Sequence, residues 1–569
     1  MSSALFKRGM FSILALALLL RVWGLDYALP DILMTDEWFE VKRALKLGAG
    51  VFDLERVGKG GYYYLLFVMF GIYFVALKLF GAVGGSSDFL LHIFRDPTGL
   101  WLVGRGTTAA IGVLNVYLMI RLGTAMRDRT VGLIAGGFLA VHLMHVRSSH
   151  SITVDVPMVC ALTAGLWLVY AWRDREQLQA KHYALLGVLT AIATATKLPA
   201  AVFVVCVGML HLLHVQRRGR WFLLDALLDR RLLAYVAGGL IYVGLEPGIV
   251  IKIGDIFRLL LSFFQPSQGV QAADLPYPVI PDRFGAIPVF YWRTLFPPVQ
   301  SLLAVATGVG ILAAWRRDGV LRHPGVVFAV IFAAFLLSSK NPHQIYERYT
   351  LPILPIVLLY AASSVRDLAG WMRNRWVPVA VMLILAAPMI VASVQLDIDF
   401  GRPDTRIETR KWIEDNIPSG TSIFIAGGLV RTSALTAQLR IDPDEVDRKV
   451  GGRLVDTGQA MTGQKSAFYD AYKQAMREYG TTYKLILTDD AAEVRAALDE
   501  GRGEYALLVQ EARELFDHEI NRSTFPDQWR LWSLVESGGF TLVKDFPRQP
   551  GWLGPNLKLY RRVDEEAQE

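Results

Sequence analysis

Two acidic residues stand where the first apolar run of the sequence ends. Asp36 and Glu37 open the stretch "TDEWFEVKRALKLG". A carboxylate at a dry, shielded interface can act as a general base toward a hydroxyl group, because partial desolvation makes it a stronger proton acceptor. The alternative is that Thr35 or Asp36 caps an amphipathic helix, whose dipole favours acids in the first turn. The pair alone does not decide between these interpretations.

A third acid lies at the boundary between two other apolar runs. Asp155 stands in "HVRSSHSITVDVPMVCALTAGL", and an ionisable residue within a membrane-spanning segment usually has a function. The alternative is a helix cap near Thr153. His145 and His150 border the same turn, and we interpret them as interface residues rather than as metal ligands.

Cations occupy comparable boundaries further along the chain. Lys197 interrupts the apolar stretch "AIATATKLPAAVFVV", and Arg348 and Tyr349 precede the apolar run of "ERYTLPILPIVLLY". A lysine at such a place can simply extend to the interface, and an arginine there can be an anchor in the headgroup layer. Alternatively, both cations meet an anion such as a lipid phosphate. Together with the acids, they could hold a pyrophosphate or phosphodiester leaving group while an acceptor loses its proton.

Composition identifies the kind of scaffold that must position these residues. The chain has 569 residues, of which 53% are hydrophobic and 20% charged, and its mean hydropathy is +0.34. These values are typical of polytopic membrane proteins. The net charge of +7 does not indicate nucleic-acid binding, because the basic residues form short clusters between apolar runs, as in cytoplasmic loops. Cys160 and Cys206 lie in apolar runs and predict neither a disulfide framework nor a thiolate metal site.

The apolar runs predict about 11 membrane-spanning helices, the first of which is expected to remain uncleaved. They lie near 10–29, 100–120, 130–147, 154–171, 183–196, 198–214, 232–250, 296–315, 325–339, 350–364 and 377–396. The run at 60–85 is interpreted as a re-entrant or interfacial helix, since an additional crossing would place the basic loops on both faces. With this count, Asp36, Asp155, Lys197 and Arg348 all emerge on the external face.

Charge density rises after residue 396, where a second domain is expected. We therefore divide the chain into a transmembrane domain over 1–396 and an external α/β domain over 397–569. A helix followed by a strand is predicted within 404–428, and further strands in "YKLILTDD", "FTLVKDF" and "NLKLYRR". The "AGG" after the first strand lacks the spacing of a dinucleotide-binding fingerprint.

Several of these motifs, in this order, resemble the bacterial members of glycosyltransferase family 39 and its relatives. These are the C-type (GT-C) membrane glycosyltransferases, which include protein O-mannosyltransferases and the lipid A aminoarabinose transferase. The resemblance covers nearly the whole chain. The motifs that carry it are Arg21, the Asp36–Glu37 pair, the "YYYL" run, "SxxxxxD" ending at Asp155, "ATKLP" at Lys197, "ERYTLPILP" at Arg348 and "DTRxxxxxWIxxNIPxG" at 404–420.

The resemblance implies transfer of a hexose or pentose from a polyprenyl-phosphate donor to an acceptor on the external side of the membrane. It matches Asp36 to the catalytic base, Asp155 to a second carboxylate and Lys197 to a lysine that contacts the donor phosphate. Some relatives have a Pro-Pro segment in the first loop, whereas this chain has "VGKGGYYYL" with Lys59. We therefore predict that no metal or other cofactor is required, although a divalent metal stays an alternative.

The predicted mechanism is inverting and independent of metal. Lys197, Arg348 and Tyr349 bind the donor phosphate, Asp36 removes the acceptor proton, and Asp155 or Glu37 assists. The donor's lipid tail would lie in a lateral groove near the re-entrant helix, and the loop at 263–284 is a candidate lid. The expected partners are a polyprenyl-phosphate sugar, membrane lipids and a glycolipid, polysaccharide or protein acceptor, but no nucleic acid.

Other functions stay open at this point. A transporter or flippase of lipid-linked glycans, and an oligosaccharide-block transferase or polymerase on the same fold, are the alternatives. The expected location is a bacterial inner or plasma membrane, with the active site and the second domain on the extracytoplasmic side.

Overall fold

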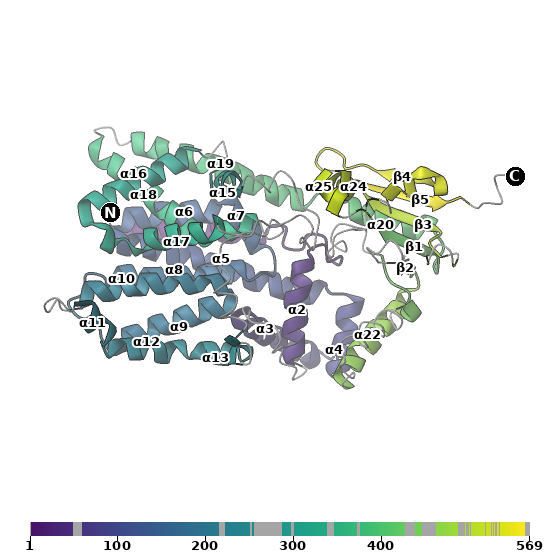
Figure 1. Cartoon of the computed structure of the whole chain (residues 1–569), viewed down its shortest axis with the longest axis horizontal. Helices are drawn as coiled ribbons and strands as arrows, with labels where there is room; N and C mark the ends of the chain where they lie inside the picture. The colour runs from purple at the N-terminus through teal and green to yellow at the C-terminus, as the bar shows by residue number, and fades with distance from the viewer. Residues whose placement is uncertain are drawn as a thin grey trace.

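The chain folds into a long helical part followed by a smaller part built on a β-sheet (Figure 1). The computed structural model describes residues 2–48, 60–215, 222–250, 253–254, 287–296, 301–337, 346–372, 376–426, 439–445, 463–486, 496, 500, 502–517, 519–524, 526, 529, 532–533 and 535–563. The predicted lid at 263–284, Lys59 and the glycines of "AGG" lie outside these residues.

The helical part contains a helix in each predicted span. In its first half these elements are α1 (Ser3–Val22), α2 (Thr35–Gly48), α3 (Gly60–Leu79), α4 (Ser86–Arg95), α5 (Thr98–Met126), α6 (Arg129–Val141), α7 (Leu143–Ser149) and α8 (Asp155–Trp172). They continue as α9 (Ala180–Thr196), the 3-10 helix η1 (Leu198–Phe203), α10 (Val204–His214), α11 (Phe222–Leu227), α12 (Arg231–Gly239) and α13 (Ile241–Leu245). The last are α15 (Ile287–Leu295), α16 (Ser301–Asp318), η6 (Val320–Arg322), α17 (Pro324–Leu337), η8 (Glu347–Thr350), α18 (Leu354–Trp371) and α19 (Trp376–Phe400).

Within the described residues, 5 helices are long and apolar enough to cross a membrane: α1, α3, α5, α8 and α19. The number rises to 6 if α6 and α7, which meet at 60°, form one broken span. Other predicted spans contain shorter helices, such as α17, or consecutive pieces, such as α12 and α13. The span count of about 11 therefore stays a prediction.

Helix α3 corresponds to the run predicted to be re-entrant or interfacial. Its 20 residues form one continuous helix that could cross a membrane by length and composition. However, its contacts with α5 lie in the first turns of that helix, where Tyr62 bonds Thr108 at 2.6 Å and Tyr73 packs against Gly99. Arg21, near the end of α1, packs deeper along α5 at Gly112. These contacts of α3 thus lie in the first half of α5, and the re-entrant or interfacial interpretation stays a prediction.

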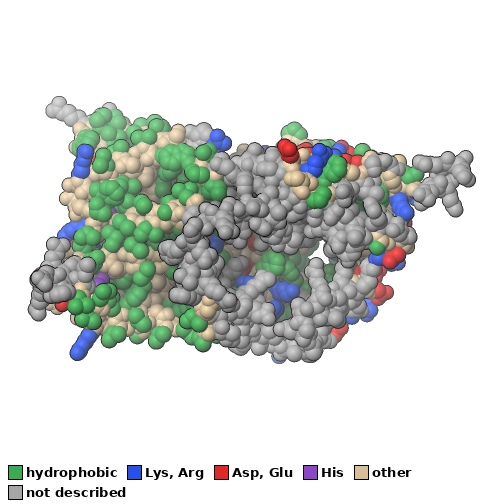
Figure 2. All heavy atoms as spheres, in the orientation of Figure 1, with side chains coloured by type: hydrophobic (Ala, Val, Ile, Leu, Met, Phe, Trp, Pro, Cys, Tyr) green, Lys and Arg blue, Asp and Glu red, His purple; other side chains and the backbone are tan. Residues whose placement is uncertain are grey.

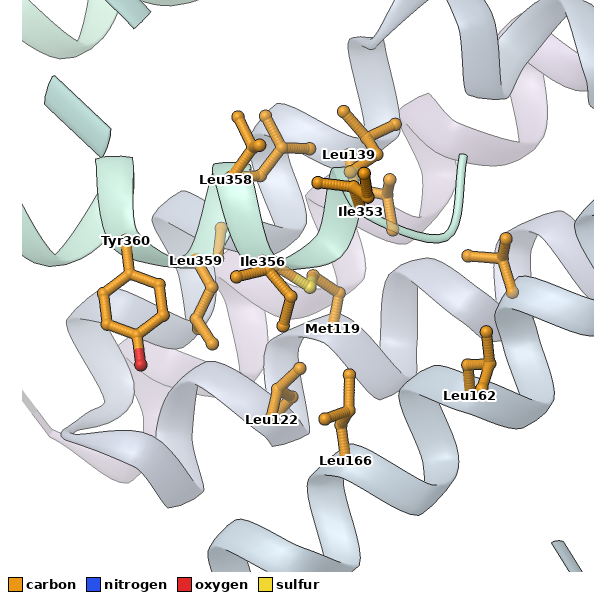
Figure 3. Close-up of a cluster of buried hydrophobic side chains, with 14 of the residues drawn as sticks. Met119, Leu122, Leu139, Leu162, Leu166, Ile353, Ile356, Leu358, Leu359 and Tyr360 are labelled. Atoms are coloured by element: carbon orange, nitrogen blue, oxygen red, sulfur yellow. The ribbon is translucent and has the colours of Figure 1, made fainter. Parts of the chain in front are cut away.

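Leucine, isoleucine and methionine side chains form the core between α5, α6, α8 and α18 (Figure 3). Met119 and Leu122 of α5 are 0% exposed, as are Leu358 and Leu359 of α18. On its other side, α18 packs against α16, where Gly310 allows a close approach of the two backbones. A Cβ atom at Gly310 would lie 2.0 Å from the carbonyl oxygen of Tyr360, so only glycine fits without a shift of one helix.

Large apolar side chains also cover the outside of the bundle, and Figure 2 shows hydrophobic groups spread over its surface. Val236, Val305 and Val391 are 58%, 62% and 67% exposed and lie on three different helices. An apolar surface of this extent requires a nonaqueous environment. The chain is therefore an integral membrane protein.

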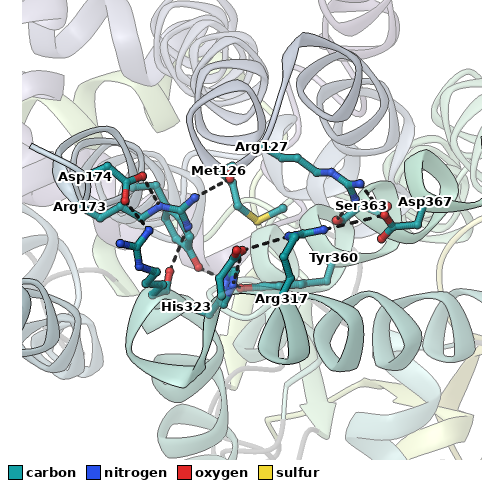
Figure 4. A network of polar contacts seen from close by, with 12 residues as sticks. Met126, Arg127, Arg173, Asp174, Arg317, His323, Tyr360, Ser363 and Asp367 are labelled. Carbon is teal, nitrogen blue, oxygen red and sulfur yellow. Dashed lines mark hydrogen bonds and ion pairs between the residues drawn. The ribbon is translucent and has the colours of Figure 1, made fainter. Parts of the chain in front are cut away.

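One end of the bundle carries a network of arginines and acids (Figure 4). Arg127 donates to Ser363 Oγ at 3.0 Å and pairs with Asp367, while Arg173 donates to the carbonyl oxygen of Met126 at 2.8 Å. Helix α8 begins at Asp155 and ends at Trp172, so Arg173 and Asp155 mark its opposite ends. The network thus gathers basic residues of several loops at the end remote from Asp155.

The C-terminal part contains a mixed 5-stranded sheet with the order β2-β1-β3-β5-β4. Its elements are α20 (Thr405–Asn416), β1 (Ser422–Ala426), α22 (Gly463–Tyr479), β2 (Lys484–Ile486), β3 (Tyr505–Val509), α24 (Gln510–Asp517), α25 (Glu519–Thr524), the π-helical turn η10 (Val535–Gly539), β4 (Phe540–Phe546) and β5 (Leu557–Arg562). Strand β1 is parallel to β2 and β3, and β5 is antiparallel to β3 and β4.

The strands predicted in the C-terminal part are present as β1, β2, β4 and β5, whereas β3 was not predicted. The expected boundary after residue 396 falls inside α19, which continues to Phe400. Asp397, in this last part of the helix, is buried.

Candidate active site

Five predicted site residues from four separate segments meet in what we call the mouth cluster: Asp36, Asp155, Lys197, Arg348 and Tyr349. Asp36 Oδ2 lies 2.7 Å from Arg348 Nη1, and Arg348 Nε lies 3.7 Å from Asp155 Oδ2. The other oxygen of Asp155 accepts a hydrogen bond from Lys197 Nζ at 2.5 Å. The acids and cations therefore alternate along one chain of ion pairs.

Helix ends place each member of the mouth cluster. Asp36 lies in the first turn of α2, and Asp155 is the first residue of α8, where the helix dipole favours a carboxylate. Lys197 ends α9 in an extended conformation, because Pro199 follows Leu198 and η1 starts a new direction. Arg348 and Tyr349 lie in the short helix η8.

The two acids of the cluster differ in exposure. The Asp155 side chain is 3% exposed and lies between two cations, whereas the Asp36 side chain is 30% exposed. Burial would lower the pKa of the Arg348 guanidinium, but Asp155 and Asp36 outweigh burial and raise this pKa above its ordinary value. Arg348 therefore stays charged. Of the two acids, Asp36 is the one that a second molecule can reach.

Aromatic rings line the cationic side of the cluster. Lys197 Nζ lies 4.4 Å from the centroid of the Tyr349 ring, and the Arg348 guanidinium lies 4.6 Å from that of Tyr346. The two rings meet edge to face at 5.4 Å. Burial raises the pKa of Tyr349 to about 12, so this side chain keeps its proton. Rings at these distances attract cations and limit their movement.

Glu37, although adjacent to Asp36 in sequence, does not join the mouth cluster. Its carboxylate is 0% exposed and accepts two hydrogen bonds from Arg105, at 2.9 and 2.8 Å. Glu37 Oε1 also accepts a hydrogen bond from the backbone N–H of Ile152 at 3.1 Å. The two neighbours point apart because successive helical residues face different directions.

Arg105 is the important residue that the sequence analysis missed. Besides Glu37, it donates to the carbonyl oxygens of Leu25 and Tyr27, at 2.9 Å each. It thereby ties α5 to α2 and to the segment that follows α1. Its signal was present in the sequence, because a lone arginine in the apolar run "LWLVGRGTTAAIGV" is unusual in a membrane-spanning helix.

The other polar residues noted in the sequence have separate partners. His145 Nδ1 lies 2.8 Å from Arg21 Nη2 and its Nε2 lies 2.9 Å from Asn115, inside the bundle. Arg147 pairs with Glu347 at 3.0 Å, and both side chains are largely exposed. Among the residues that the structure describes, no group of three or more His, Cys, Asp or Glu side chains could hold a metal ion.

Comparison with known protein families finds a similarity in the middle of the helical part. The family whose model matches, over residues 89–238, is described as dolichyl-phosphate-mannose-protein mannosyltransferase. The matched residues include Asp155 and Lys197 and end before Arg348. No curated protein sequence matches the chain.

Solved structures with a similar backbone course include the following two. The archaeal oligosaccharyltransferase AglB from Archaeoglobus fulgidus, in complex with an inhibitory peptide and a dolichol-phosphate, aligns over 94% of this chain and 73% of its own, with 11% identity and a TM-score of 0.46. ArnT from Cupriavidus metallidurans, bound to undecaprenyl phosphate, aligns over 98% of both chains, with 12% identity and a TM-score of 0.47.

Proposed function

We propose that this protein transfers one sugar from a polyprenyl-phosphate donor to an acceptor hydroxyl on the extracytoplasmic face of the membrane, with inversion at the anomeric carbon. The observation that carries the proposal is the alternating chain Asp36–Arg348–Asp155–Lys197. It combines an accessible base with two cations suited to a phosphate. The basic network at the opposite end of the bundle supports the assignment of this end to the outside.

The cations account for binding of the donor and for stabilising its leaving group. Arg348 and Lys197 are now neutralised by Asp36 and Asp155. A donor phosphate that approaches the two cations offers them a stronger set of acceptors and displaces Asp36 from Arg348. This exchange releases the Asp36 carboxylate in the step that brings the sugar into place. The cations then stabilise the charge that develops on the departing polyprenyl phosphate.

The transfer itself is a single displacement. The acceptor oxygen forms a bond to the anomeric carbon while the bond between that carbon and the phosphate oxygen breaks. The electron pair of the broken bond leaves with the polyprenyl phosphate, and the acceptor proton passes to Asp36. Attack on the face opposite the leaving group inverts the configuration. No metal enters these steps.

The remaining predicted residues receive supporting roles in this mechanism. Asp155, buried between Arg348 and Lys197, fixes the spacing of the two cations rather than receiving a proton. Glu37, with Arg105, fixes the first turn of α2 and thereby the direction of Asp36. Tyr349 supports Lys197 through its ring. Burial and contacts support these roles, so we infer one proton acceptor, Asp36, and two positioning carboxylates, Asp155 and Glu37.

The decisive experiment compares wild type with Asp36→Asn in lipid nanodiscs. Each protein receives a panel of radiolabelled polyprenyl-phosphate hexoses and pentoses and a crude envelope fraction as acceptor. We expect Asp36→Asn to reduce the rate by about 10²- to 10⁴-fold, the usual contribution of a general base, and to retain donor binding. NMR of the product identifies the anomeric configuration.

A suitable control is Glu347→Gln, because Glu347 neighbours Arg348 but pairs outward with the exposed Arg147. This variant is expected to keep the wild-type rate. Equal rates for Asp36→Asn and wild type would exclude the role given to Asp36. Donor binding without transfer by wild type, combined with donor movement across vesicles, would favour a flippase, and transfer of preassembled oligosaccharides would favour a block transferase.

A further inference from the structure

The segment between α1 and α2, residues 23–34, leads directly into Asp36, and we call it the first loop. The helical part holds the first loop from one side. Arg105 donates to the carbonyl oxygens of Leu25 and Tyr27, and His150 Nε2 lies 2.9 Å from the carbonyl oxygen of Trp23. These contacts fix the beginning of the loop, and Ser151 Oγ donates to Met34 Sδ at 3.0 Å just before α2; none of these contacts involves the side chains of Tyr27 or Asp31.

The sheet-containing part holds the first loop from the other side, through helix α20. Asp404 accepts a hydrogen bond from the Tyr27 hydroxyl at 2.9 Å, and Arg410 Nη2 lies 2.9 Å from Asp31 Oδ2. The Arg410 and Asp31 side chains are only 10% and 8% exposed. A buried, charge-assisted contact of this kind is far more restrictive than an exposed ion pair.

Asp404, the N-cap of α20, and Arg410 within the helix are themselves held firmly. Asp404 caps α20 by accepting from the backbone N–H of Arg406 at 2.9 Å, and it also pairs with the Arg406 guanidinium at 2.6 Å. Arg410 makes a second ion pair, with Glu414, at 3.0 Å. The side chains that contact the first loop are therefore themselves held in place by other contacts of α20.

We propose that Asp404 and Arg410 are positioning residues of the transfer reaction, which hold Tyr27 and Asp31 so that Asp36 meets Arg348 and the acceptor in the correct geometry. The inference rests on the proposed function and extends it, because it assigns a role to residues of the "DTRxxxxxWIxxNIPxG" motif. Asp404 and Arg410 thus contribute to catalysis from the C-terminal part without contacting the reacting atoms.

A second contact between the same two parts provides a matched control. Arg95 at the end of α4 pairs with Glu478 of α22 at 2.5 Å, but its side chain is 53% exposed and it does not contact the first loop. Removing this pair alters the attachment of the C-terminal part without altering the support of Asp36. If the α20 contacts only attach the C-terminal part, their removal should lower stability, as removal of the exposed pair does to a smaller extent, but it should leave kcat and the hydrogen exchange of the first loop unchanged.

The experiment compares Arg410→Gln and Tyr27→Phe with Arg95→Gln in the full-length protein in nanodiscs. We expect kcat to fall roughly 10- to 100-fold in Arg410→Gln, since a misplacement of about 1 Å can reduce a rate by that order, while the donor KM stays within twofold. Tyr27→Phe should fall by less, and Arg95→Gln should match wild type. A double variant, Asp31→Asn with Arg410→Gln, should lose no more than Arg410→Gln alone, because both act through one contact.

A second readout does not depend on activity. Hydrogen exchange of the peptide that covers residues 25–40, followed by mass spectrometry, should be faster in Arg410→Gln than in wild type and unchanged in Arg95→Gln. Unchanged exchange in Arg410→Gln overturns the inference even if no transfer is detected. If wild type transfers sugar and Arg410→Gln matches Arg95→Gln in kcat, the inference fails while the proposed function stands.

Discussion

Lys197 illustrates how a single residue type can be assigned a function only after its neighbours are known. In sequence it could have been a lysine that extends to the interface. In the structure its ammonium lies between the buried carboxylate of Asp155 and the ring of Tyr349, beside Arg348. That environment supports the proposed role in phosphate binding and differs from that of a side chain directed to bulk water.

Removing the Lys197 charge should therefore weaken donor binding more than it affects the chemical step. We expect Lys197→Met to raise the dissociation constant of a labelled polyprenyl-phosphate sugar by about 10- to 100-fold, because a hydrogen bond to a charged group contributes roughly 1.5–3 kcal/mol. Equilibrium binding in nanodiscs measures the effect. Lys181→Met is the control, since Lys181 is an exposed residue in the first turn of the same helix. Equal affinities for the two variants would contradict the assignment.

At this scale the sequence predicted much of the site, because Asp36, Asp155, Lys197, Arg348 and Tyr349 do meet. Counting the apolar runs as membrane crossings was sufficient to predict that these residues lie at one end of the bundle. It could not separate Asp36 from Glu37, because their difference depends on which helix face meets Arg105. That contact joins residues far apart in the chain, and no local pattern specifies it.

The residues of the mouth cluster lie at the ends of helices, so the packing of these helices determines the distances between them. Helix α18 begins just after η8, which carries Arg348 and Tyr349, and it packs closely on α16 at Gly310. Periodicity predicted helices in both regions. It missed β3, whose residues "YALLV" form a short apolar run that is compatible with either a buried strand or a helix.

The contact of α16 with α18 gives a prediction about stability. Gly310→Ala should lower the thermal midpoint, because its Cβ would meet the backbone of Tyr360 and overpacking costs typically 1–3 kcal/mol. Gly308→Ala on the same helix is the control, since no atom lies within 4 Å of the position of its Cβ, and alanine favours a helix over glycine by about 1 kcal/mol. The melting of both variants in detergent can be followed by fluorescence. Equal midpoints would show that the two helices do not approach closely at Gly310.

On the scale of the whole molecule, the distribution of charge defines two ends. The arginine network of Figure 4 lies at the end of the bundle where α5 and α8 terminate. The mouth cluster and the sheet-containing part lie at the other end (Figure 1). The sequence predicted this polarity from its basic clusters alone. It could not predict that α20 holds the first loop, because Asp31 and Arg410 become neighbours only when both parts are folded.

The polarity leads to a prediction about orientation in the cell. A cysteine introduced at Gln549, an exposed position near the end of β4, should react with a membrane-impermeant maleimide in intact cells, whereas one at Gln177, in the exposed turn between α8 and α9, should react only after permeabilisation. The native Cys160 and Cys206 are buried and should give little background. The reason is that Gln177 lies near Arg173 at the basic end, which the positive-inside rule retains in the cytoplasm. Labelling in the opposite order would place the mouth cluster on the cytoplasmic face, where it would meet a cytoplasmic acceptor instead of an external one.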